Sequence, residues 1–81
     1  MKVQVKLFAV VGDVVGDDEI AVELPETATV SDLKAKLLAD YPALEGVLEH
    51  VMFAVDSQYA EPDQTLCEDA EVALIPPVSG G

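Results

Sequence analysis

The sequence has few of the residues on which most catalytic and metal sites depend. Its 81 residues include one cysteine, Cys67, and one histidine, His50. A single cysteine excludes an internal disulfide framework and a cysteine-based metal cluster within one chain. One histidine leaves few candidates for a nucleophile–base pair. We therefore assign neither residue a role, expect no metal site, and regard an independent enzyme as the least favoured class.

Basic residues and long apolar runs are also scarce. Four basic residues stand against sixteen acidic ones, which gives a formal net charge of −12. This charge repels phosphate backbones and anionic lipid surfaces, so we expect no nucleic-acid partner and no membrane partner. No stretch approaches the roughly 20 apolar residues of a membrane span, and the first residues do not resemble a signal peptide. We expect a protein of the cytoplasm.

Two runs near the start alternate between polar and apolar residues. Residues 2–8 place three aliphatic side chains on one face, and residues 19–24 alternate in the same way. The two runs are expected to pair as antiparallel strands. Phe8 is an anomaly, because it falls on the charged face of its strand. The stretch between the runs is predicted to be a loop, on the evidence of Gly12, Asp13, Gly16 and Asp17.

Residues 29–41 carry the pattern of one helix. Thr29 and Asp32 have the T-x-x-D spacing of a helix start, in which side-chain oxygens satisfy free backbone N–H groups. Apolar residues then recur at helical spacing as far as Tyr41. Pro42 follows, and the residue before a proline resists the helical conformation. The main helix is therefore predicted to end there.

The second half is less regular. Residues 51–55 predict a short strand, and residues 70–75 predict the last strand, with Ile75 on its polar face. Residues 43–50 predict one short helical turn, and turns are expected at residues 56–57 and 61–63.

This order of strands around one helix predicts an α+β domain with a mixed sheet and one main helix on one face. The β-grasp, or ubiquitin-like, fold is the compact solution with that order. In it the first and last strands are parallel neighbours, so Phe8 and Ile75 are expected to lie close together opposite the helix. We predict a β-grasp domain over residues 1–75 and an extended tail over residues 76–81.

The segment VALIPPVSGG, together with KLFA and LPETATVSDLKAKL, resembles the MoaD-type sulfur carriers, the small-subunit family of molybdopterin synthase. The resemblance extends from Val3 to Gly81, and the double proline before the two glycines is its most specific element. It implies that an E1-like enzyme adenylates Gly81 with ATP and that a persulfide donor converts it to a thiocarboxylate. It also implies a heterotetramer with a large subunit, whose catalytic residues transfer the sulfur to the pyranopterin precursor of the molybdenum cofactor. No tightly bound cofactor is implied for this chain, which would be a non-catalytic, sulfur-carrying subunit.

The residues of the tail support the same chemistry. A terminal carboxylate is a poor electrophile, but joining it to AMP supplies a good leaving group, after which a persulfide sulfur can attack. Glycines do not obstruct a narrow channel, and two prolines stiffen an extended exit. We expect Phe8 and Ile75 to form a docking patch beside the tail. The residues expected to enter a partner's active site are Pro76, Pro77, Val78, Ser79, Gly80 and Gly81.

Two alternatives stay open. A ubiquitin-like modifier, or a sulfur carrier for tRNA thiolation or thiamine synthesis, uses the same activated Gly81. A plain interaction domain has an inert tail. Accumulation of a thiocarboxylate distinguishes the inert domain from the carriers, and linkage of Gly81 to lysines of many proteins identifies the modifier.

Overall fold

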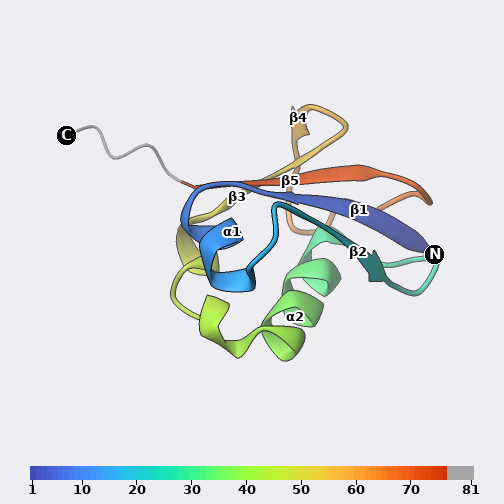
Figure 1. Ribbon diagram of the computed structural model, residues 1–81. Helices are drawn as coiled ribbons and strands as arrows, with labels where there is room; N and C mark the ends of the chain where they lie inside the picture. Colours follow the sequence, from blue (N-terminus) through green and yellow to red (C-terminus); the bar gives the residue numbers. More distant parts are fainter. Residues whose placement is uncertain (77–81) are drawn as a thin grey trace.

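The computed structural model describes residues 1–76, which form a five-stranded sheet with one long helix packed on one face (Figure 1). The strand order is β2-β1-β5-β3-β4. Within residues 1–76, the other face of the sheet carries no helix, and it is called the open face below. The strands are β1 (Lys2–Leu7), β2 (Glu19–Glu23), β3 (Met52–Val55), β4 (Gln58–Tyr59) and β5 (Glu71–Ile75). The helices are α1 (Val10–Val15) and α2 (Val30–Asp40), with 3-10 turns η1 (Pro42–Leu44) and η2 (Leu48–His50).

The first and last strands lie side by side at the centre of the sheet. β1 and β5 are parallel, β1 pairs with β2 in antiparallel register, and β5 pairs with β3 in antiparallel register. The predicted mixed β-grasp sheet is therefore confirmed. The alternating aliphatic residues of the central strands point to the helix side and are buried, as are the apolar residues of α2. This core includes Val3, Val5, Leu7, Val72 and Leu74 from the sheet and Val30, Leu33 and Leu37 from the helix.

The main helix begins and ends where its sequence signals predict. The Thr29 Oγ1 accepts a hydrogen bond from the Asp32 backbone N–H at 3.3 Å, and the Asp32 Oδ2 accepts one from the Thr29 N–H at 2.9 Å. This reciprocal capping box satisfies two donors that the first helical turn leaves free. At the other end, the Tyr41 N–H donates to Leu37, and the proline that follows stops the helix.

The predicted loop between the first two strands is wrong in part, because it contains the short helix α1. Val11 is fully buried there, and its burial compensates for a poor helix-forming sequence. The helix ends at Gly16, whose φ of 88° is in the left-handed region and whose N–H donates to the Gly12 carbonyl at 2.8 Å. A side chain at Gly12 would be crowded, because a Cβ there would lie 3.2 Å from the Asp17 carbonyl oxygen and 3.3 Å from that of Leu7.

Two further details differ from the prediction. The segment of residues 43–50 holds parts of two 3-10 turns rather than one helical turn. The turn predicted at Asp56–Ser57 leads into β4, a strand of two residues that no pattern in the sequence indicated. Both turn residues have positive φ, 49° and 72°, which is typical of the two-residue type I′ hairpin turn.

Candidate docking face and tail

Three apolar side chains gather at the end of the open face where β5 finishes. Met52 and Ile75 are register partners in the β3–β5 pair. Phe8 comes one position after the paired residues Leu7 and Leu74, so the backbone register sets it beside Ile75. Leu7 and Leu74 are buried on the helix side, and alternation therefore turns the next residues to the open face. We call Phe8, Met52 and Ile75 the open-face patch.

The open-face patch is accessible to a partner. The exposed fraction is 47% for Phe8 and 52% for Met52, whereas Ile75 is half-buried between its neighbouring strands. The structure thus brings together Phe8 and Ile75, the two residues singled out from the sequence. It adds Met52, which sequence reasoning missed because residues 51–55 are apolar throughout and show no alternation. Large exposed apolar side chains that gather at one place are typical of an interaction surface.

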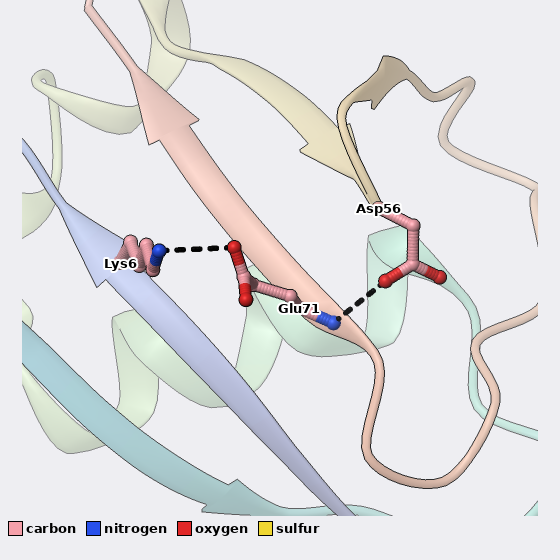
Figure 2. Close-up of polar contacts among 3 residues, drawn as sticks. All are labelled: Lys6, Asp56 and Glu71. Atoms are coloured by element: carbon pink, nitrogen blue, oxygen red, sulfur yellow. Dashed lines mark hydrogen bonds and ion pairs between the residues drawn. The ribbon is translucent and has the colours of Figure 1, made fainter.

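An ion pair lies beside the open-face patch, across the two central strands (Figure 2). The Lys6 Nζ is 3.0 Å from the Glu71 Oε1. The hydrogen bond to Glu71 and the attraction of its charge raise the pKa of Lys6 above its ordinary value. Lys6 pairs in register with Ala73, two positions before Ile75. On the open face, this ion pair therefore lies next to the open-face patch, and its two opposite charges offset one another.

Glu71 is itself fixed by the turn after β3, as Figure 2 shows. The Glu71 N–H donates to the Asp56 Oδ1 at 3.1 Å, and the Asp56 N–H donates to the Glu71 carbonyl at 2.8 Å. These bonds anchor the start of β5 to the β3–β4 turn. The strand that carries Ile75 is therefore held on both sides, by β1 and by β3.

The chain leaves the sheet at the open-face patch. Pro76 follows Ile75 directly and is half-buried. The remaining tail residues singled out from the sequence, Pro77, Val78, Ser79, Gly80 and Gly81, lie outside the described residues. A tail that starts here begins beside whatever partner covers the open-face patch.

Other candidate chemistry is limited in the part of the chain that the structure describes. Within residues 1–76, no group of three histidine, cysteine, aspartate or glutamate side chains is placed to hold a metal ion. Cys67 is exposed with a free thiol. None of the described helices has the length and apolar character needed to cross a membrane.

The sheet order, with one capped helix on one face, is the β-grasp architecture of ubiquitin-like proteins. The crystal structure of small archaeal modifier protein 1 from Haloferax volcanii superposes with a TM-score of 0.90 at 30% identity, over 100% of both chains. A structure from Pyrococcus furiosus, described as putative molybdopterin converting factor, subunit 1, gives 0.90 at 31% identity over 96% of this chain and 99% of that one. A complex of subunits 1 and 2 of the molybdopterin-converting factor of Helicobacter pylori shares the fold, with a TM-score of 0.73 at 21% identity over 100% of both chains.

Sequence comparison identifies the family within that class. The model of the ThiS family matches residues 5–81, and the chain belongs to this family, which the MoaD-type sulfur carriers share. The molybdopterin synthase sulfur carrier subunit of Chlamydomonas reinhardtii is 39% identical over 83 residues, covering 100% of both chains. Small archaeal modifier protein 1 of Haloferax volcanii is 32% identical, over 94% of this chain and 97% of its own length.

Proposed function

We propose that this protein is the sulfur-carrying small subunit of a molybdopterin synthase. One observation carries the proposal: the relative from Chlamydomonas reinhardtii, named as that subunit, aligns with this chain over the full length of both. The family match extends as far as Gly81 and thus includes the last two glycines, which supports the same assignment. The protein would act in the cytoplasm, where ATP is available to the activating enzyme.

The proposed chemistry takes place at the carboxyl group of Gly81. An E1-like enzyme joins this carboxylate to the α-phosphate of ATP and releases pyrophosphate. A persulfide sulfur then attacks the acyl carbon and AMP leaves, which forms an acyl disulfide. A second thiol of the sulfur-donating protein attacks the donor's sulfur, so that a disulfide forms on that protein and a thiocarboxylate is released on Gly81. The thiocarboxylate gives its sulfur to the pyranopterin precursor in the active site of the large subunit. The small subunit contributes the reactive carbon and its delivery, and it binds no cofactor tightly.

The open-face patch is proposed to position that delivery. The homologous Helicobacter pylori structure contains subunits 1 and 2 of the molybdopterin-converting factor, which supports a two-protein assembly for this chain. Phe8, Met52 and Ile75 lie where the chain leaves the sheet. A large subunit that covers them receives the tail beside its contact surface. We propose a heterotetramer of two small and two large chains.

Moving the reactive carbon tests the proposal. Deleting Gly81, or adding one alanine after it, displaces the carboxyl carbon by roughly 3.5 Å in an extended chain. A misplacement of about 1 Å can reduce a positioned reaction on the order of a hundredfold. Each protein is incubated with the activating enzyme, ATP and a sulfur source, and its intact mass is measured. The unaltered chain should gain the mass of one oxygen-to-sulfur exchange, and the two variants should not.

The control for this experiment is thermal stability. The described core extends from Val3 to Leu74, so both variants should melt at the temperature of the unaltered chain. Equal sulfur loading of the extended variant would contradict the role of Gly81. If the unaltered chain were loaded with sulfur but did not transfer it to a pyranopterin, the protein would still be a sulfur carrier, but its role in the molybdopterin pathway would be contradicted.

A second candidate function is supported by the match to small archaeal modifier protein 1, which is similar in sequence and superposes closely. In this alternative the activated Gly81 is joined to lysine amines of other proteins. Mass spectrometry of proteins isolated from the native cell distinguishes the two. Gly-Gly remnants on lysines of many proteins support the modifier, and co-purification with one large subunit in equal amounts supports the synthase subunit.

A further inference from the structure

A groove lies between α2 and the outer edge of β3, apart from the open face. It consists of two adjoining hollows of about 330 and 240 Å³, which share Lys34, Leu48 and Glu49 as lining residues. Phe53 lines the second hollow from β3, and Met52 is the one residue that the groove shares with the open-face patch. Neither the ion pair on the open face nor the tail chemistry uses this groove.

The backbone at the edge of the groove has unused hydrogen-bonding groups. Since the Asp56 N–H donates to Glu71 across the antiparallel pair, alternation directs the backbone groups of Val51 and Phe53 away from β5. On that side the Ala60 N–H donates to the Phe53 carbonyl at 2.9 Å, and then the chain turns away. Within residues 1–76, the Phe53 N–H donates to no backbone carbonyl and the Val51 carbonyl accepts from no backbone N–H.

These two free groups flank Met52 with the spacing of a sheet ladder. In a parallel pair, each bonding residue of the added strand faces one residue of the existing strand. Its N–H donates to the carbonyl of the residue before that facing residue, and its carbonyl accepts from the N–H of the residue after it. The Val51 carbonyl and the Phe53 N–H stand in that relation to Met52. Val51 and Phe53 both line the second hollow. A strand edge with unused backbone groups binds extended peptides through main-chain hydrogen bonds, while neighbouring pockets select side chains.

The lining of the groove specifies the side chains of the added strand. Leu48 forms part of an apolar floor shared by both hollows, and half-buried Leu38 lines the larger one. Two exposed carboxylates, Glu45 and Glu49, line the same hollow and outnumber its one amine, Lys34. A bulky aliphatic side chain fits the floor, and basic side chains fit the rim. A second copy of this chain does not fit, because each copy carries a formal charge of −12.

We propose that this groove binds an extended, basic and aliphatic segment of a partner protein, which adds to the edge of β3 at Val51 and Phe53. Its aliphatic side chains pack on Leu48 and Leu38, and its basic side chains lie against Glu45 and Glu49. The partner thus has a contact surface separate from the open-face patch and adjacent to it through Met52.

A synthetic peptide of defined composition tests the proposal on the full-length protein. The probe is the capped heptapeptide Lys-Lys-Val-Ile-Val-Lys-Lys, in which alternation places aliphatic and lysine side chains on the same face of the strand. Its counterpart carries glutamate in place of every lysine. Titration is followed by amide NMR. The basic peptide should saturably shift the amide signals of Leu48 and Phe53 and slow hydrogen exchange at the Phe53 N–H, and the acidic peptide should do neither. The measurement needs no activating enzyme, so it fails independently of sulfur loading.

Two sets of variants identify the contact. Glu45→Lys with Glu49→Lys should weaken binding of the basic peptide about tenfold, since both reversals remove attraction and add repulsion. Leu38→Arg should weaken it about as much, because a cation then occupies the apolar floor. Glu26→Lys with Glu68→Lys makes the same change in net charge away from the groove and should leave affinity within about twofold.

Several results would overturn the proposal. Shifts confined to the open-face patch would place the peptide on the other surface. If Glu26→Lys with Glu68→Lys weakened peptide binding as much as Glu45→Lys with Glu49→Lys, net charge alone would explain the attraction. A change at the Phe53 amide when the chain is shortened to Pro76, without any peptide, would mean that the groove belongs to the protein's own tail.

Discussion

Phe8 and Met52 are the single residues on which docking of a large subunit is expected to depend most. Both expose about half of their surface beside Ile75, and apolar anchors at the centre of an interface often contribute about 2 kcal/mol or more. Phe8→Asp or Met52→Asp should therefore weaken binding to the large subunit by roughly thirtyfold. Isothermal titration calorimetry measures the affinity. Unchanged circular dichroism should accompany the loss, because neither side chain belongs to the core.

Tyr59→Asp is the matched control for these variants. Tyr59 is 67% exposed and lies on β4, at the edge of the sheet rather than beside the chain's exit. The substitution introduces the same charge while leaving the open-face patch intact, so affinity should change little. If Tyr59→Asp weakened binding as much as Phe8→Asp, or if Phe8→Asp had no effect, the open-face patch would not be the docking site.

The residues of the candidate site differ in how far sequence could predict them. Phe8 and Ile75 were predictable, because Phe8 directly follows β1 and Ile75 ends β5, and both strands alternate clearly. Met52 was not, because its neighbours are all apolar and only the register with Ile75 decides which face it takes. The backbone groups of Val51 and Phe53 are unused because the pairing of β3 with the following segment ends at Ala60. No local sequence pattern indicates where this pairing ends.

At the scale of elements, the capping box should contribute measurably to the stability of α2. Thr29→Ala removes the oxygen that accepts from the Asp32 N–H, and loss of such a cap typically costs about 1 kcal/mol. Thr29→Ser keeps the oxygen and should retain most of the stability. Urea unfolding followed by circular dichroism measures the difference. Equal midpoints for the alanine and serine variants would mean that the tertiary contacts of α2, not its cap, determine where the helix begins.

Long helices and strands whose ends carry clear sequence signals were predictable, and short ones without such signals were not. The main helix has a capping box, a periodic apolar face and a terminating proline, and its predicted bounds are confirmed within one residue. The six-residue helix α1 and the two-residue strand β4 have no such signals. They form because tertiary structure buries Val11 and because the hairpin turn at Asp56–Ser57 returns the chain to β3. Local propensity alone does not specify either element.

The molecule as a whole carries far more negative charge than its ion pairs offset. Among the described residues, the ion pairs are Lys6–Glu71 and Lys36–Asp40, both between exposed side chains. Exposed pairs of this kind contribute little, about 0–1 kcal/mol each. The formal charge of −12 therefore acts mainly as self-repulsion on the folded state, which opposes the burial of the apolar core.

Salt should therefore stabilise this protein. The radius of gyration is 11.7 Å, so at about 0.01 M salt, where the screening length is about 30 Å, carboxylates repel across the whole molecule. At about 1 M salt the screening length falls to about 3 Å, and only neighbouring charges interact. Relief of about 1 kcal/mol corresponds to a rise in Tm of about 4–8 °C for a domain of this size. Thermal unfolding in increasing sodium chloride, followed by circular dichroism, measures the rise.

A variant with less charge separates screening from the general effect of salt on apolar burial. Glu26→Gln, Glu45→Gln and Glu68→Gln remove three exposed carboxylates, none of which belongs to a described ion pair. This variant should melt higher than the unaltered chain at low salt, and its Tm should rise less as salt is added. The two curves should converge near 1 M, because the repulsion that separates them is screened there. If the Tm of both proteins rose in parallel with salt concentration, the salt effect would come from strengthened apolar burial instead. The folded state would then tolerate its charge without a cost to stability.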